Sequence, residues 1–201
     1  MEQDRGDDSM RVADAESRFV ALLKFDLVGS TKISQALNPS DELELRRAYE
    51  AAVERLISGD KVKLEWEGDG GLLVFGYYEV RVDAAEVAVR TALKLIDVVR
   101  SVDVVPRVRL EVRTGVASGP VTIDRARDKL SRVKPVSRAA RLMEYAGPGQ
   151  LLIAEDTKRL VQDFFEYDDL GVVDLYDAGP MHVWRVVRET SVVSRFAAPA
   201  A

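Results

Sequence analysis

The pattern of apolar and polar positions along this chain predicts strands that alternate with helices. Residues 19–26 form a nearly continuous apolar run, which is typical of a buried strand. In residues 61–67 apolar and charged side chains alternate, so one face of a strand would be apolar and the other charged. Asp69-Gly70 is typical of a hairpin turn, and residues 72–75 are predicted to return as its second arm.

Helices are predicted where apolar residues recur every three or four positions. The first long helix should begin in the cap-forming segment 38–42 and stop at Gly59, and a second should span about 83–100. Further on, the pattern predicts strands at 108–116, 151–153 and 182–187, a segment at 120–123 that pairs with or extends the first of these, and helices at 136–145 and 155–163. This order predicts an α+β domain of ferredoxin-like type, a mixed or antiparallel sheet backed by helices.

The composition is that of a globular protein with short tails. The chain has 201 residues, of which 47% are hydrophobic and 31% charged, which is enough for one domain with its own core. We expect this domain to span residues 18–188, between a disordered acidic tail at 1–17 and a flexible tail at 189–201. The acidic N-terminal segment lacks the basic and apolar regions of a signal peptide.

Charge and cysteine content argue against several classes of function. The formal net charge of −5 argues against general nucleic-acid binding, which needs a basic surface. No apolar run approaches the ~18–20 residues that cross a membrane. With no cysteine, the chain has neither disulfides nor thiolate metal sites, which fits a reducing compartment. We therefore expect a cytoplasmic protein that binds neither nucleic acid nor membranes.

Two aspartates stand where the backbone must turn. Asp26 follows the first strand and Asp69 occupies the hairpin turn. Carboxylates at neighbouring strand ends make an oxygen-rich site for a hard divalent cation, with Mg²⁺ the favoured ion, and the adjacent glycines leave backbone N–H groups open to phosphate. Each aspartate alone could serve only its turn, but the pair favours phosphoryl chemistry on a nucleotide.

Five segments, in order, carry a family resemblance. They are residues 25–31 (FDLVGST), 68–75 (GDGGLLVF), 113–121 (RTGVASGPV), 136–142 (VSRAARL) and 146–153 (AGPGQLLI). Together they resemble the motifs of the class III nucleotidyl cyclases, the adenylate and guanylate cyclase catalytic domain family, over about residues 18–188. The resemblance implies a ferredoxin-like cyclase catalytic domain that forms a head-to-tail homodimer with two composite active sites.

The resemblance also implies a set of metal and phosphate ligands. Asp26 and Asp69 would bind two Mg²⁺ or Mn²⁺ ions per active site, with the backbone carbonyl of Leu27 as a further ligand. The ions would activate the ribose 3′-hydroxyl for in-line attack on the α-phosphate and hold the departing pyrophosphate. The β- and γ-phosphates would meet the N–H groups of the turn that follows, made of Gly29, Ser30 and Thr31.

The catalytic helix of the family would supply Arg141, which stabilises charge at the α-phosphate, and Ser137, one turn earlier on the same face. In this family the ions and the arginine come from different subunits, so a second copy would cover the polar strand face that carries Glu65. Lys61 and Lys63 on that face are expected to be solvent-facing. Ser137 replaces the asparagine of the family, and Tyr176 stands where a phosphate-binding lysine is expected.

Glu65, four residues before Asp69, stands where the resemblance places a base-reading side chain. An ionised glutamate only accepts hydrogen bonds, which suits the N–H of guanine or uracil and disfavours ATP and CTP. The second base-reading position is the apolar Leu130, and the bulky Tyr49 and Trp66 could narrow the pocket to pyrimidine size. We predict UTP as the substrate and cyclic UMP as a messenger for a downstream effector, as in the stand-alone pyrimidine cyclases of bacterial anti-phage (Pycsar) systems.

Two other functions stay open. A guanylate cyclase that makes cyclic GMP is the first, because Glu65 suits guanine as well. A catalytically silent nucleotide-binding or dimerisation domain is the second; Ser137 and Tyr176 favour it, and the intact metal and arginine positions oppose it. A metal-dependent phosphatase usually needs more ligands, and His182, the single histidine, is expected to be structural.

Overall fold

The computed structural model of the chain describes residues 15–124, 129–130 and 134–190. The strands are β1 (Ala15–Leu27), β2 (Val62–Glu67), β3 (Gly70–Phe75), β4 (Val112–Asp124), β5 (Lys129–Leu130), β6 (Leu151–Ala154), β7 (Phe165–Asp174) and β8 (Pro180–Glu189). The helices are α1 (Ser30–Ala36), α2 (Pro39–Ile57), α3 (Ala84–Arg100), α4 (Lys134–Tyr145) and α5 (Glu155–Val161), with a 3₁₀ turn, η1, at Tyr176–Ala178.

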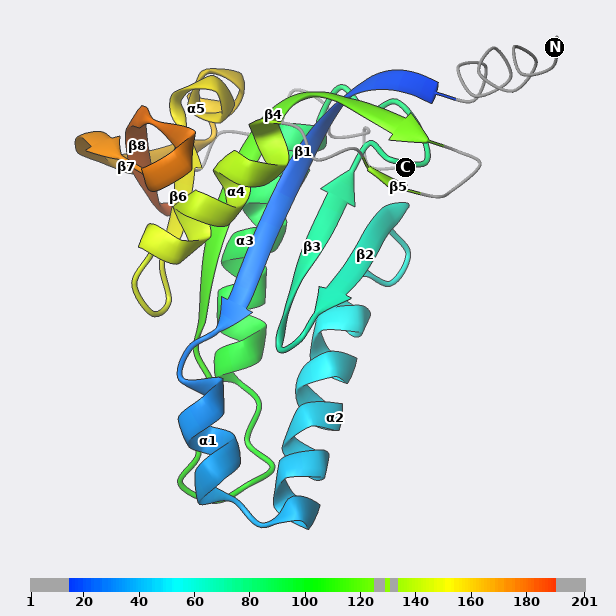
Figure 1. Ribbon diagram of the computed structural model, residues 1–201, viewed down its shortest axis with the longest axis vertical. Helices are drawn as coiled ribbons and strands as arrows, with labels where there is room; N and C mark the ends of the chain where they lie inside the picture. The colour runs from blue at the N-terminus through cyan, green and yellow to red at the C-terminus, as the bar shows by residue number, and fades with distance from the viewer. Residues whose placement is uncertain (1–14, 125–128, 131–133, 191–201) are drawn as a thin grey trace, which may run out of the picture.

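One sheet organises the domain, with the long strands β1 and β4 at its centre (Figure 1). Its strand order is β2-β3-β1-β4-β6-β8-β7, with β5 paired to β4. The β4–β6 pair is parallel and the other pairs are antiparallel, so the predicted mixed α+β sheet is confirmed.

The two faces of the sheet bury separate apolar cores, because successive side chains of a strand point to opposite faces. Leu23 and Phe25 of β1 pack with α2 and α3 on one face. Leu22 of β1, with Leu72 and Val74 of β3, packs with α4 on the other, which we call the α4 face. Figure 1 shows α3 and α4 on opposite sides of the central strands.

The predicted elements differ from the structure mainly at their ends. β1 begins at Ala15, so it includes the last three residues of the segment expected as an N-terminal tail, and residues 1–14 lie outside the described part. The stretches expected at 108–116 and 120–123 form one strand, β4, which starts only at Val112. At the other end, Glu189 still belongs to β8, and residues 191–201 are outside the described part.

Four elements were absent from the sequence-based prediction: α1, β7, the two-residue strand β5 and the 3₁₀ turn η1. The helix α1 follows directly on Gly29, in a segment expected as a phosphate-binding turn. The strand β7 has an exposed, largely acidic sequence and pairs with β8 at the edge of the sheet. No helix in the described ranges is both long and apolar enough to span a bilayer.

Candidate active site

The structure brings Asp26 and Asp69 to the same end of the sheet. Phe25 pairs with Gly71, so the β2–β3 turn that carries Asp69 lies directly beside Asp26. A Cβ atom built on Gly70 would stand 2.4 Å from the carbonyl oxygen of Phe25 and 3.2 Å from Oδ1 of Asp26. Only glycine therefore lets the turn close onto the end of β1.

Tyr49 of α2 contacts the backbone of the β2–β3 turn. Its hydroxyl donates a hydrogen bond to the backbone carbonyl of Asp69 at 2.9 Å. Its ring is 3% exposed and packs edge-on against Trp66, with the ring centroids 5.8 Å apart. Burial, followed by the charges of Asp69 and Asp26, raises the pKa of Tyr49 far above its ordinary value. The phenol therefore stays neutral and acts as a donor that fixes the Asp69 backbone.

Asp26 has a basic neighbour that the sequence alone did not reveal. Arg113 of β4 is its cross-strand partner, and Nε and Nη2 of Arg113 donate to Oδ2 of Asp26 at 3.0 and 2.7 Å. Nη1 of Arg113 also approaches the backbone carbonyl of Glu144 in α4, at 3.4 Å. This pair links the candidate metal carboxylate to the end of α4.

A cavity of about 250 Å³ opens between α1, α2 and the β2–β3 turn. Five residues singled out from the sequence line it: Leu27, Ser30, Thr31, Tyr49 and Asp69. Gly29 is the N-cap of α1 and has a φ of +71°, a conformation that glycine adopts readily. Asp26 and Gly29 are not among the lining residues, so the pocket holds only part of the candidate metal and phosphate set, together with the charged side chains of Glu42, Arg46 and Glu50.

The donor set fits a divalent cation that shares its coordination with a substrate. In the described part of the chain, no three acidic or histidine side chains converge as a ready metal cage. Mg²⁺ is commonly held by one or two carboxylates while substrate phosphates and water complete its shell. Asp26, Asp69 and the carbonyl of Leu27 match that requirement.

Arg141 and Ser137 lie on α4 and do not line the cavity that contains Asp69. Arg141 pairs with Glu144 at 2.5 Å, and its guanidinium lies 5.3 Å from the ring centroid of Tyr176. Tyr176 is 85% exposed, and Ser137 is exposed as well. Within one chain, the residues expected to act on the α-phosphate are therefore placed apart from the pocket of Asp69.

The packing of α4 depends on Gly115 of β4. A Cβ on Gly115 would lie 2.4 Å from backbone atoms of both Ala139 and Met143. Because those atoms belong to the helix backbone, they cannot yield as a flexible side chain would. Gly115 therefore allows α4 to lie directly on the sheet, which sets the position of Arg141.

Glu65 lies on the α4 face of β2, where it pairs with Lys63 at 3.3 Å. The expectation that Lys63 faces solvent is wrong, because the residue is only 6% exposed. Its ammonium lies 4.3 Å from the ring centroid of Tyr77 and 3.3 Å from the Tyr77 hydroxyl. Lys61 is exposed as expected and pairs with Glu79.

The remaining predicted residues lie elsewhere. Leu130 is in β5, where its backbone pairs with Ile123, and its side chain is outside the described part. Trp66 packs against the core on the α2 and α3 face. The ring of His182 stacks on Trp184 in β8, and its Nε2 lies 2.6 Å from Asp169 in β7, at the far edge of the sheet.

The domain is thus a helix-backed sheet with two acidic side chains at one end of its strands, close to a pocket. The sequence profile of the adenylate and guanylate cyclase catalytic domain matches residues 12–187. This chain belongs to that family, which is a family of class III cyclases.

One curated relative matches most of the chain. The chain is 30% identical over 194 residues to the uncharacterized protein R02095 of Rhizobium meliloti (strain 1021), covering 92% of this chain. It spans only 19% of the length of that curated relative.

Solved cyclase domains share the fold. A non-canonical dimeric guanylyl cyclase domain of the RhoGC fusion protein from the aquatic fungus Blastocladiella emersonii superposes with a TM-score of 0.77 at 23% identity, covering 87% of this chain and 99% of that one. The adenylyl cyclase CyaB from P. aeruginosa gives 0.76 at 18% identity, covering 90% and 99%.

Proposed function

We propose that this chain cyclises a nucleoside triphosphate to a 3′,5′-cyclic nucleotide and pyrophosphate, in a homodimer whose two sites are each shared between subunits. The observation that carries this proposal is the separation of two residue sets. Asp69 and the turn after Asp26 line one pocket, and neither Arg141 nor Glu65 lines it, although both lie on the α4 face that also carries Asp26. A head-to-tail partner would bring the second set of one subunit to the first set of the other.

Each set has its own task in the reaction. Class III cyclases generally depend on divalent metal, which when bound would lower the pKa of the attacking ribose hydroxyl and neutralise the phosphates. Asp26, Asp69 and the Leu27 carbonyl would hold it, and the N–H groups of residues 29–31 would orient the β- and γ-phosphates. The guanidinium of Arg141 from the partner would meet charge that develops at the α-phosphate.

For the base we propose uracil, so that the product is cyclic UMP. The carboxylate of Glu65 pairs with Lys63 and would accept a hydrogen bond from N3–H of uracil. GTP is the second candidate, because the N1–H of guanine offers the same donor. We extend the proposal to an anti-phage signal read by a separate effector, on the resemblance to pyrimidine cyclases alone.

The primary test incubates the pure protein with each of the four nucleoside triphosphates and Mn²⁺ or Mg²⁺, and identifies products by mass spectrometry. We expect cyclic UMP as the main product, and cyclic GMP as the main product would replace uracil with guanine. An Asp69→Asn variant serves as the inactive control. Absence of any cyclic product would end the enzyme assignment and favour a silent nucleotide-binding domain.

Complementation tests the shared site. Asp69→Ala and Arg141→Ala should each be inactive, because each removes one half of both sites. Mixed in equal amounts and allowed to exchange subunits, they should recover about a quarter of the wild-type sites, since half of the dimers are mixed and each has one intact site. No recovery after exchange has been confirmed by native mass spectrometry would place both halves in one subunit.

A further inference from the structure

A second lysine shares a cross-strand row with Glu65. Lys24 of β1 pairs with Leu72 of β3, and Leu72 pairs with Glu65 of β2. Directly paired residues point to the same face of a sheet, so Lys24 and Glu65 flank Leu72 on the α4 face. On its other side Lys24 pairs with Gly115, over which α4 lies. The row therefore runs from the helix that carries Arg141 to the residue proposed to read the base.

The amino group of Lys24 is held at the surface of this face. The side chain is 12% exposed, and Nζ reaches Oε2 of Glu67 at 2.8 Å. The Glu67 side chain is 58% exposed. Because the Glu67 carboxylate is open to solvent, it can turn away and leave the Lys24 ammonium to an acceptor on a ligand. The ammonium of Lys24 is therefore a hydrogen-bond donor that β1 holds in position and that can reach a ligand.

Lys63 differs from Lys24 in its partners rather than in its burial. Its side chain is 7% exposed and lies against both the ring and the hydroxyl of Tyr77. It contacts Glu65 at 3.3 Å, two positions further along the same face of β2. Lys63 therefore positions the carboxylate of Glu65, whereas Lys24 can meet a ligand itself.

We propose that Lys24 is a specificity-determining residue, whose Nζ donates to the base carbonyl oxygen beside the N–H that Glu65 accepts. This inference rests on the proposed cyclase function. Uracil has carbonyl oxygens on both sides of N3–H, and guanine has O6 beside N1–H. Adenine and cytosine place an amino group at that position, so an ammonium would face another donor. Lys24 supplies a hydrogen-bond donor beside the acceptor of Glu65 and strengthens the selection of keto bases.

The test removes the donor and the acceptor separately. The wild-type protein and Lys24→Met are compared with UTP, 4-thio-UTP and 2-thio-UTP, because sulfur is a weak acceptor and N3–H is retained. If GTP is the substrate, GTP and 6-thio-GTP replace them. We expect wild type to prefer the oxygen nucleotide over one thio analogue by about 10- to 100-fold in kcat/KM, and Lys24→Met to lose that preference. A lysine that only stabilised the fold would lower all rates together and leave the ratio unchanged.

Two matched variants complete the experiment. Lys61→Met removes an exposed ammonium from the start of β2, outside the row, and should keep the wild-type ratio. Glu67→Gln keeps Lys24 but removes its charge partner, and should also keep the ratio. If Lys24→Met does not fold, the preference of the wild type for the oxygen nucleotide still tests the inference. A wild-type protein indifferent to sulfur, a retained ratio in Lys24→Met, or a lost ratio in Glu67→Gln would overturn the role of Lys24. A cyclic product made at normal rates in those cases would leave the cyclase function standing, whereas no product from any wild-type reaction would refute both.

Discussion

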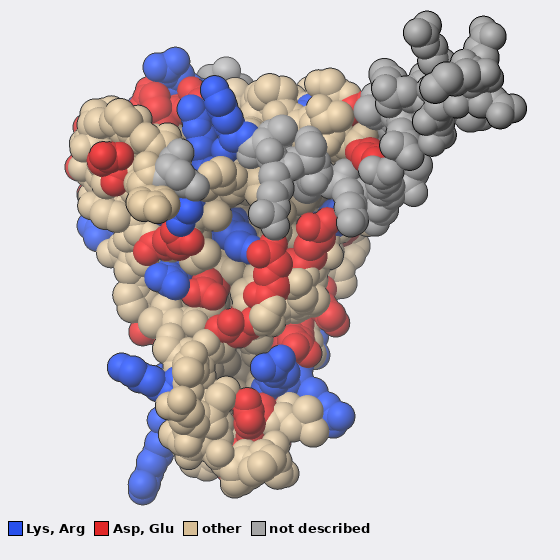
Figure 2. All heavy atoms as spheres, viewed as in Figure 1, with Lys and Arg blue, Asp and Glu red and all other residues tan. Residues whose placement is uncertain are grey.

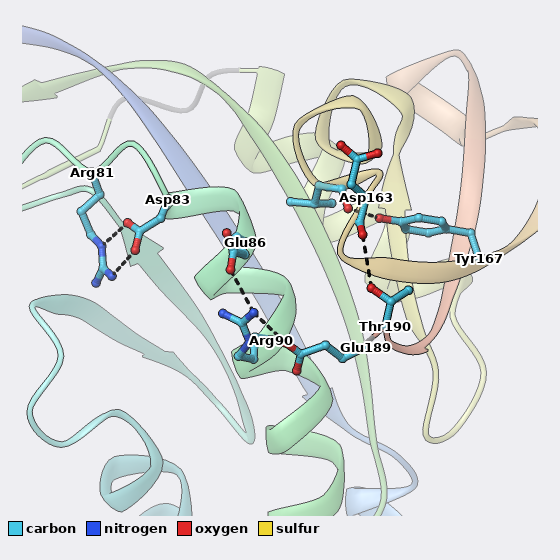
Figure 3. Close-up of polar contacts among 9 residues, drawn as sticks. Arg81, Asp83, Glu86, Arg90, Asp163, Tyr167, Glu189 and Thr190 are labelled. Carbon is cyan, nitrogen blue, oxygen red and sulfur yellow. Dashed lines mark hydrogen bonds and ion pairs between the residues drawn. The ribbon is translucent and has the colours of Figure 1, made fainter. Parts of the chain in front are cut away.

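Two charged networks on opposite sides of this domain serve different purposes. At the start of α3, Arg90 binds Oε1 of Glu86 at 2.9 Å and Oε1 of Glu189 at 2.6 Å, which ties the helix to the end of β8 (Figure 3). On the α4 face, the described contacts give Arg113 and Lys24 one carboxylate each, Asp26 and Glu67 respectively. In the view of Figure 2, acidic side chains gather over the region of β2 and β3.

The difference lies in burial and in the number of partners. Glu86 is 2% exposed, and its Oε2 has no hydrogen-bond partner among the described residues. The ion pair with Arg90 is therefore the main interaction that offsets the cost of burying this carboxylate. Such a pair is costly to break and suits a structural contact. The carboxylates of the α4 face are more exposed, at 26% for Asp26 and 58% for Glu67. These pairs can exchange a protein partner for a cation or a nucleotide, as an active site requires.

The largest effect on stability is expected from Arg90→Met. The substitution leaves the buried Glu86 carboxylate without its cation and should lower the free energy of unfolding by about 3 kcal/mol. Cyclase activity at 25 °C should remain, because the site does not contact Arg90. Urea unfolding followed by circular dichroism measures the change. Arg188→Met, which removes an exposed pair with Glu166, is the matched control and should cost less than about 0.5 kcal/mol.

The double variant Arg90→Met/Glu86→Leu sharpens this result. It removes both charges and should recover most of the lost stability, since the apolar side chain no longer needs a partner. If Arg90→Met is as stable as wild type, the contacts of Arg90 with Glu86 and Glu189 in Figure 3 do not stabilise the fold. The proposed difference between a structural network at α3 and exchangeable pairs on the α4 face would then be wrong.

A smaller loss of stability, together with a loss of activity, is expected from changing Tyr49, which contacts the β2–β3 hairpin. Tyr49→Phe removes the donor to the Asp69 carbonyl, which should lower stability by about 1 kcal/mol and activity about 10-fold, because the turn that holds Asp69 loosens. Tyr167→Phe is a close match, because the Tyr167 hydroxyl also donates to a backbone carbonyl, that of Val161. It should lose similar stability with unchanged kcat/KM. Equal activity losses in both variants would remove Tyr49 from the site.

Local signals in the sequence were sufficient for several elements. Asn38 caps α2 by accepting from the N–H groups of Ser40 and Asp41, which is the helix start that the cap residues predicted. The alternating pattern of β2 and the Asp69-Gly70 turn also predicted the hairpin that carries the candidate metal residue. In both cases residues close in the chain determine the structure.

Features that depend on distant pairing were not predictable in this way. Arg113 contacts Asp26 across 87 positions, and this contact follows from the register of β1 on β4. β7 lacks an apolar run, and pairing with β8 supports it, with cross-strand ion pairs such as that of Arg185 with Asp168. Lys63 looked solvent-facing from alternation alone, because the sequence does not show that Tyr77 covers it.

The smallest expected effect is a pH dependence at the start of α3, where Arg81 binds Asp83 through two hydrogen bonds of 2.9 and 3.0 Å (Figure 3). The hydrogen bond from Arg81 lowers the pKa of Asp83 below its ordinary value of 3.8. A carboxyl whose pKa is lowered by folding stabilises the protein above its unfolded pKa, and this contribution is lost as the pH falls.

Asp83→Asn should therefore be less stable than wild type at pH 7, and the difference should shrink as the pH falls below about 4. Urea unfolding at a series of pH values measures it. Asp103→Asn, which removes a carboxylate that is 65% exposed and pairs with Arg109, should show a smaller difference at pH 7. A difference for Asp83→Asn that grew toward acid pH would reverse the sign of this linkage. The Arg81 contact would then not stabilise the start of α3, and the structural network would reduce to the Arg90 contacts alone.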